Sequence, residues 1–260
     1  MAGPAINLEN VSKSFADNKV LRGIDLGVPA GGSLVVIGPS GTGKTVLLKT
    51  LIGVHAPDGG RITIDGTDVS SLDGADKRAL YGRFGMLFQK SGLFDSLPVW
   101  ENVAFRLLQK DGMTRRDARD RAIEKLGLVG LPPGEADLFP SELSGGMQKR
   151  VGIARAMAAD PDVLLLDEPT AGLDPIMSNV INDLILEVMD KTGATVISVN
   201  SDMRGAARTA QNATMIYDGR IIWHGPTADM RDSDNAYVDQ FVHSRAEGPI
   251  PTIVDPAAVA

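Results

Sequence analysis

The chain of 260 residues contains no cysteine and no long apolar run. Without cysteine it has no disulfide framework, no thiolate metal site and no cysteine nucleophile. No segment approaches the roughly 18 consecutive apolar residues that a membrane-spanning helix needs. The N-terminus also lacks a basic region followed by an apolar stretch, which is the pattern of a secretory signal. We therefore expect a cytoplasmic protein that reaches a membrane only through a partner.

A basic excess is missing as well. The net charge is −7 and the pI is about 5.0, whereas surfaces that follow nucleic-acid phosphates are usually basic. This charge balance argues against a nucleic-acid partner. Two basic pairs, Arg115-Arg116 and Lys149-Arg150, are expected to lie on solvated helix faces. The length and the 43% hydrophobic content fit one globular unit or two small lobes.

A glycine-rich segment between two apolar runs is the strongest functional signal. Residues 33–37 predict a buried strand and residues 46–52 a helix. Glycines let consecutive backbone N–H groups turn inward around an anion, and a helix N-terminus adds partial positive charge. In such a loop Lys44 would reach the β- and γ-phosphates of a nucleotide, and the Thr45 hydroxyl would bind Mg²⁺. The candidate binding residues are Gly38, Pro39, Ser40, Gly41, Thr42, Gly43, Lys44 and Thr45. The alternative is a glycine turn that contains Gly-Lys-Thr by chance.

The first part of the chain alternates apolar and polar residues as strands do. Residues 6–11, 24–28 and 61–65 show this pattern, and we expect them to form an antiparallel layer beside the phosphate-binding strand. From about residue 89 the apolar residues take helical spacing. Segments 97–108 and 115–128 are predicted helices, and the second ends before a Pro-Pro-Gly break.

A second alternating α/β stretch follows the helical part. Strands are expected at 162–167 and 194–199, with a helix at 175–191 between them, and residues 215–223 predict a hairpin with an Asp-Gly turn. Alternation of strands and helices predicts a mostly parallel central sheet. The fold class is therefore α/β, with the helical insert as a separate lobe.

An acidic pair ends one of the predicted buried strands. Asp167 and Glu168 follow Leu164-Leu-Leu, at the sheet edge where α/β proteins bind phosphates. Asp167 would help to hold Mg²⁺, and Glu168 would polarise the water that attacks the γ-phosphate. The alternative is that the acids cap a helix, which would not require both of them.

The segment Leu143-Ser-Gly-Gly-Met-Gln148 resembles the signature of the ATP-binding cassette (ABC) family, Leu-Ser-Gly-Gly-x-Gln. Ser144, Gly145 and Gly146 precede a predicted helix over 147–159, so unpaired backbone N–H groups can hold an anion there. A chain that already has a phosphate loop needs a second anion grip only for a neighbour's nucleotide. This predicts two copies packed head to tail around ATP. A plain capped helix would explain Ser144 but not the paired glycines, which weaken helices.

The same resemblance implies further roles. Gln89 matches the family's glutamine loop, which touches Mg²⁺ and relays to the membrane partner, and residues 171–174 match the loop that couples the two active sites. Phe15 stands where the family places an aromatic ring against adenine. The implied fold is a P-loop NTPase (RecA-like) core over 1–88 and 156–240 with an antiparallel β subdomain. The resemblance also implies an inserted helical subdomain over residues 89–155 and a C-terminal extension over residues 241–260.

One position departs from the family pattern. The family normally has a histidine after the strand that follows the coupling loop, but here Ser201 follows Asn200. A serine can donate a hydrogen bond, yet it is shorter and carries no charge at neutral pH. Ser201 is therefore a candidate catalytic residue in place of the histidine switch. Either the switch works in a different way in this protein, or ATP turnover is slow.

Residues 90–105 and the tail at 241–251 resemble the ATPase subunits of Mla/Mce-type lipid transporters. That resemblance implies a cytoplasmic ATPase on the inner face of the inner membrane, with separate permease subunits. It also implies that the tail reaches onto the partner ATPase. A small regulatory subunit and a periplasmic lipid-binding protein are implied as further partners. An importer ATPase for another small solute and a non-transport ABC ATPase remain the alternatives. The latter usually has two cassettes or a long coiled-coil insert, and this chain has neither.

Overall fold

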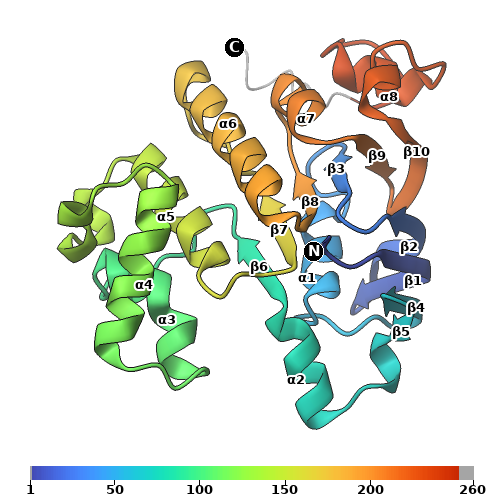
Figure 1. The fold of residues 1–260 in the computed structure, drawn as a ribbon. Helices are drawn as coiled ribbons and strands as arrows, with labels where there is room; N and C mark the ends of the chain where they lie inside the picture. Colours follow the sequence, from blue (N-terminus) through green and yellow to red (C-terminus); the bar gives the residue numbers. More distant parts are fainter. Residues whose placement is uncertain (1, 252–260) are drawn as a thin grey trace.

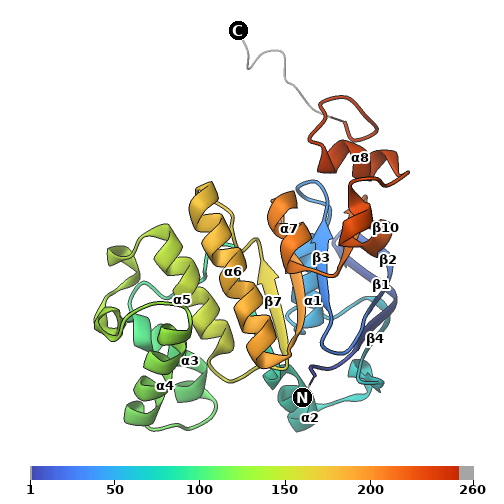
Figure 2. The same cartoon turned by 45° about the horizontal axis from the view of Figure 1, so that its top comes forward.

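The computed structural model describes residues 2–251. Its strands form two sheets on one side of the molecule, and a group of helices lies beside them (Figures 1 and 2). The helices are α1 (Lys44–Leu51), α2 (Gly74–Gly82), α3 (Val99–Gln109), α4 (Arg115–Leu128), α5 (Gly145–Met157), α6 (Pro175–Thr192), α7 (Met203–Thr209) and α8 (Ala236–Val242), with short 3₁₀ turns η1 (Val69–Ser71), η2 (Pro133–Asp137), η3 (Pro140–Glu142) and η4 (Thr227–Met230). Within the described residues, no helix combines the length and the apolar character needed to cross a bilayer.

The smaller sheet is antiparallel, as its alternating sequence predicts. It contains β1 (Ile6–Phe15), β2 (Asn18–Val28), β4 (Gly59–Ile64) and β5 (Thr67–Asp68) in the order β2-β1-β4-β5. Ile6 and Leu8 of β1 are buried while Asn7 and Glu9 face solvent, which is the period of a half-buried strand. Val11 is also buried, after a shift in the register of pairing with β2 between Leu8 and Val11. This sheet therefore has one apolar face that must pack on the rest of the core.

The larger sheet has six strands in the order β10-β9-β3-β8-β7-β6. They are β3 (Ser33–Ile37), β6 (Phe84–Leu87), β7 (Val163–Asp167), β8 (Thr195–Val199), β9 (Asn212–Tyr217) and β10 (Arg220–Pro226). The five strands from β9 to β6 run parallel, and β10 runs antiparallel to β9. The turn between β9 and β10 places Asp218 and Gly219 at positive φ, 45° and 71°, which is the conformation that favours Asp-Gly in a two-residue hairpin. The mostly parallel sheet predicted from the sequence is confirmed.

The two faces of the larger sheet have different partners because successive side chains point in opposite directions. Leu34 and Val36 of β3 pack with α1 and the antiparallel sheet. Val35 and Ile37 face the opposite way, toward α7 and α8. Helix α1 thus lies between the two sheets, and its N-terminus is fixed by the end of β3.

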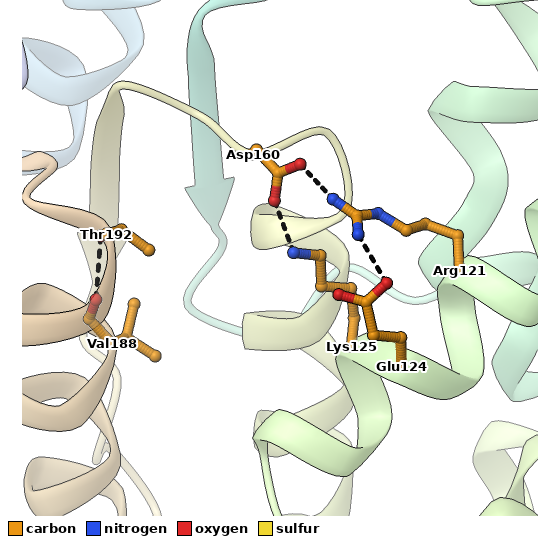
Figure 3. A network of polar contacts seen from close by, with 6 residues as sticks. All are labelled: Arg121, Glu124, Lys125, Asp160, Val188 and Thr192. Carbon is orange, nitrogen blue, oxygen red and sulfur yellow. Dashed lines mark hydrogen bonds and ion pairs between the residues drawn. The ribbon is translucent and has the colours of Figure 1, made fainter. Parts of the chain in front are cut away.

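The helices α3, α4 and α5 share a core with α6 and the β6–β7 side of the larger sheet. A polar network adds a tie between α4 and the turn after α5 (Figure 3). Asp160 in that turn accepts from the ammonium of Lys125, at 2.5 Å, and from the guanidinium of Arg121. Asp160 has φ 46°, so the ion pairs hold a turn conformation that most residues avoid.

The end of the described chain folds back on itself. The Gln240 side chain of α8 donates to the carbonyl of Ile250 at 3.0 Å and accepts from its N–H at 2.7 Å. Ile250 also packs against the cluster that contains Val238 and Val242. Residues 241–251 therefore contact their own chain. Residues 252–260 of the expected C-terminal extension lie outside the described residues, and its reach onto a partner stays a prediction.

Candidate nucleotide-binding site

The glycine-rich loop connects β3 to α1 at the end of the parallel strands. Gly38, Gly41 and Gly43 adopt φ of 136°, 81° and 102°, values that L side chains rarely adopt. A Cβ on Gly38 would lie 2.2 Å from the carbonyl oxygen of Ile216. Gly43 is the N-cap and α1 begins at Lys44, so the partial positive charge of the helix is directed into the loop. The backbone thus forms a cradle that fits a phosphate.

Lys44 lies across this loop. Its ammonium donates to the carbonyls of Gly38 and Pro39, both at 2.7 Å. Burial lowers the pKa of Lys44, and the nearby carboxylates of Glu168 and Asp167 act in the opposite direction. The Thr42 hydroxyl donates to the Pro39 carbonyl at 3.0 Å and closes the turn. A cation is therefore held where the loop would surround an anion.

Asp167 ends β7 next to the start of α1. Its carboxylate accepts from the Thr45 hydroxyl at 3.2 Å. Burial raises the pKa of Asp167, with the hydrogen bond from Thr45 acting against that shift. Among the described residues, no group of three or more histidine and acidic side chains could hold a metal ion. The oxygen pair of Thr45 and Asp167 instead fits Mg²⁺, which commonly binds one or two protein oxygens and takes its other ligands from water and phosphate.

Glu168 is fixed by contacts to the next strand. It has φ 50°, its N–H donates to the carbonyl of Val199 at 2.9 Å, and its carboxylate accepts from both Ser201 N–H, at 3.1 Å, and the Ser201 hydroxyl, at 2.8 Å. The helix-capping alternative for the acidic pair fails, since Asp174 caps α6. Ser201 therefore lies beside Glu168, and sequence position alone could not establish that contact.

These groups converge on one pocket of about 380 Å³. Val20, Val46 and Val199 provide apolar walls that the sequence reading did not identify. Asp167 and Ser201 join the site through their bonds to Thr45 and Glu168. The predicted residues that line the pocket are Ser40, Gly41, Gly43, Lys44, Thr45, Gln89 and Glu168.

The signature residues lie apart from this pocket. Ser144 is the N-cap of α5, and its hydroxyl accepts from the N–H of Met147 at 3.3 Å. Ser144 and Gly145 are exposed, and neither they nor Gly146 line the pocket. The structure therefore does not bring the second anion grip to the chain's own phosphate loop.

Phe15 is also outside the lining of the pocket. It is 42% exposed at the end of β1, with its ring edge-to-face against His55 at a centroid distance of 5.0 Å. The ammonium of Lys13 lies 5.5 Å from the ring centroid. An exposed aromatic side chain can offer a stacking face to a base, and this role for Phe15 stays a prediction.

Lys149 was misread from the sequence. It was expected on a solvated helix face, but it is 5% exposed and its ammonium donates to the carbonyls of Gln89, at 2.5 Å, and Glu168, at 3.0 Å. Burial lowers its pKa, while Asp167 and Glu168 act in the opposite direction. A usable signal was its spacing of three from Gly146 and four from Ile153, both buried on one face of α5.

Comparisons with known proteins agree on the family. Residues 21–171 match the model of the family described as ABC transporter. The chain is 39% identical over 248 residues to the probable ribonucleotide transport ATP-binding protein mkl of Mycobacterium leprae, covering 95% of this chain and 71% of that protein. It is 35% identical over 246 residues to the intermembrane phospholipid transport system ATP-binding protein MlaF of Escherichia coli K12, covering 95% and 91%.

A solved structure extends the likeness to the fold. The ATP-binding cassette MJ0796, a dimer in a post-hydrolysis state bound to ADP and phosphate, superposes with a TM-score of 0.77 at 29% identity. The match covers 85% of this chain and 98% of that one. The P-loop NTPase fold expected from the sequence is therefore confirmed.

Proposed function

Because this chain belongs to the ABC transporter family, we propose that it is the ATP-hydrolysing subunit of a transporter that moves phospholipid between membranes through a separate permease. The observation that carries the catalytic part is the connected set of Lys44, Thr45, Asp167, Glu168 and Ser201 at one edge of the parallel sheet. A phosphate cradle, a pair of oxygen ligands and a general base are the parts that nucleoside triphosphate hydrolysis needs.

The loop from Gly38 to Thr45 binds the phosphates of ATP in this proposal. Its backbone N–H groups surround the β-phosphate, and Lys44 exchanges its two carbonyl partners for β- and γ-phosphate oxygens. Phe15 stacks on adenine. The lowered pKa of Lys44 is consistent with a buried ammonium that gains from an anionic partner.

Mg²⁺ would be held by Thr45, Asp167 and Gln89. When bound, it would neutralise charge on the β- and γ-phosphate oxygens. The hydrogen bond of 3.2 Å from the Thr45 hydroxyl to the Asp167 carboxylate supports this assignment, because it brings two of these oxygen ligands together. Gln89 lines the same pocket at the end of β6, from which its side chain can approach the ion.

Glu168 acts as the general base. Its carboxylate accepts a proton from the attacking water, whose oxygen bonds to the γ-phosphorus as the bond to the β-phosphate oxygen breaks, and ADP leaves. Ser201 positions that carboxylate through two hydrogen bonds. The serine thus keeps a place in the site although it cannot carry the charge of a histidine.

ABC cassettes form dimers, and we infer that Ser144, Gly145 and Gly146 bind the nucleotide held by a second copy. The exposure of Ser144 and Gly145, and the separation of all three residues from the chain's own pocket, support this assignment. Ser144 already accepts from the N–H of Met147, so the backbone N–H groups of Gly145 and Gly146 are the ones that would hold an anion supplied by the partner. The domain division given above, with the helical subdomain at 89–155, belongs to the same proposal.

The permease would dock on the groove between the larger sheet and the helical lobe. Phe88 and Phe94, 37% and 43% exposed, line this groove with Phe105, and exposed apolar patches of this kind mark interaction sites. The protein would then act at the cytoplasmic face of the inner membrane. A small regulatory subunit and a periplasmic lipid-binding protein would complete the transporter.

Two measurements test the proposal. Lys44→Ala and Glu168→Gln should each lower ATP hydrolysis by at least about a hundredfold, while Glu168→Gln keeps ATP binding. The transported class is tested by isolating the chain with its native permease and measuring ATP-dependent transfer of labelled phospholipid between vesicles. Transfer of a ribonucleotide or another small solute by the same complex, without lipid transfer, would favour the importer alternative. Isolation without any permease would favour a non-transport ATPase.

A further inference from the structure

Lys149 connects two loops that come from different strands. Strands β6 and β7 are parallel neighbours with Leu87 opposite Leu166, so Gln89 and Glu168 each lie two residues beyond a paired position. Their carbonyls therefore end at the same edge of the sheet. The ammonium of Lys149 donates to both, at 2.5 Å and 3.0 Å.

The partners of this lysine are unusual for a buried cation. Lys125, the other strongly buried lysine, is neutralised by Asp160 at 2.5 Å. Among the ion pairs of the described residues, none includes Lys149. Burial of a lysine without a directly paired carboxylate is costly, and the ammonium of Lys149 is held instead by the two main-chain carbonyls.

The Glu168 carbonyl has a particular need for this bond. Because Glu168 has φ 50°, its backbone leaves the strand conformation, and its carbonyl leaves the sheet and turns toward α5. A residue in this region of φ persists only where its surroundings hold it. The Lys149 ammonium supplies one of those constraints, and Val199 supplies another through the Glu168 N–H.

We propose that Lys149 is a positioning residue that couples the start of α5 to the water-activating carboxylate. Lys149 follows Ser144 by five residues, a rise of about 7.5 Å along a helix. A movement of the rigid helix that engages Ser144 with a partner's nucleotide therefore also moves the ammonium that holds Glu168 and Gln89. This inference rests on the proposed function, and it gives the helical lobe a direct connection to the general base.

The chain offers a matched control one residue away. Arg150 lies on the same helix and also donates to two main-chain carbonyls, those of Val129 and Gly130, at 3.3 Å and 3.4 Å. These carbonyls belong to the turn after α4 and have no contact with the nucleotide pocket. Arg150→Met also removes two bonds to main-chain carbonyls, although longer ones, and it leaves the loops of Gln89 and Glu168 untouched.

The experiment compares Lys149→Met, Lys149→Gln and Arg150→Met in the full chain by ATP turnover, ATP affinity and thermal unfolding. Lys149→Met should lower kcat by about 10- to 100-fold, because small misplacements of a catalytic group have effects of this size, with the Kd for ATP changed by less than about threefold. Lys149→Gln should recover part of the loss, since its amide donates two hydrogen bonds. Arg150→Met should keep kcat within about twofold of wild type, the scatter expected for an independent site.

A double variant separates positioning from general destabilisation. In the Glu168→Gln background, Lys149→Met should cost much less in kcat than in wild type, because groups that act through one another are not additive. The inference would be overturned if Lys149→Met lowered kcat by the same factor in both backgrounds. It would also be overturned if the decreases in kcat of Lys149→Met and Arg150→Met simply followed their decreases in Tm. If Lys149→Met fails to fold, Lys149→Gln carries the same comparison. A Glu168→Gln chain with wild-type turnover would instead overturn the proposed function.

Discussion

Replacing Ser201 by alanine removes one of the two hydrogen bonds that hold the Glu168 carboxylate. The hydroxyl donates to Oε2 at 2.8 Å and the backbone N–H to the same oxygen at 3.1 Å. The alanine variant keeps the N–H, so the carboxylate stays near its place with more rotational freedom. We expect a loss of turnover without a loss of nucleotide binding, since the phosphate loop is untouched.

The size of the effect follows from the kind of bond that is lost. A hydrogen bond to a charged group contributes about 1.5–3 kcal/mol, and Ser201 is exposed, which places this one near the lower limit because water competes for the carboxylate. If that energy is used in the transition state, kcat falls by about tenfold, since 1.36 kcal/mol corresponds to a factor of ten.

Steady-state ATP hydrolysis by the full chain with its permease measures this effect. Ser201→Ala should show the lower kcat at an unchanged KM for ATP, and Ser201→Thr should stay close to wild type because it keeps both donors. A Ser201→Ala chain with wild-type kcat would refute the positioning role. Equal losses in the alanine and threonine variants would show that shape at this position matters and the hydroxyl does not.

Three further variants test separate parts of the structure. Ser201→His should lower kcat, because the larger ring displaces the two donors to Glu168; a clear gain in turnover would show that the serine is a weakened switch. Burial raises the pKa of Asp167 above its unfolded value, so its charge destabilises the fold above that pKa. Asp167→Asn should therefore raise Tm at neutral pH in the absence of Mg²⁺ and nucleotide. The difference in Tm from wild type should shrink as the pH falls and Asp167 becomes protonated. A variant with a lower Tm than wild type at pH 7 would contradict this prediction. Gln240→Ala should expose residues 244–250 to protease and lower the free energy of unfolding by about 1–2 kcal/mol, because both hydrogen bonds between the Gln240 side chain and the Ile250 backbone are lost. Unchanged cleavage would contradict the fold-back of the tail.

Strong local patterns in the sequence predict much of the fold. The strand Ser33–Ile37 and the helix Arg115–Leu128 have the predicted bounds, because a bounded apolar run and a capped charged helix are specified by their own residues. Strand β1 extends to Phe15, beyond the predicted 6–11. Residues 12–14 are all partly exposed and Phe15 is exposed, so the alternation is lost there, and pairing with β2 keeps them extended.

Short helices were missed. Helix α7 has seven residues and follows its cap Asp202, one residue after Ser201, and α8 also has seven residues, after its cap Asn235. The hydrogen bond between Gln240 and Ile250 joins a side chain to the main chain ten residues later, and no periodicity of the sequence predicts it. Lys149 could have been placed on the buried face of α5, but the two carbonyls that it joins come from distant segments.

The most direct test of the account is the association state of Glu168→Gln with and without ATP, measured by sedimentation velocity. We predict a monomer without nucleotide and a stable dimer with ATP, because in the proposed arrangement each nucleotide is held by Lys44 of one copy and the Ser144 region of the other. Adding Ser144→Arg should abolish the dimer while the monomer still binds ATP, since the arginine occupies the partner's phosphate site and leaves its own loop intact. A double variant that dimerises with ATP as well as Glu168→Gln does would contradict the account.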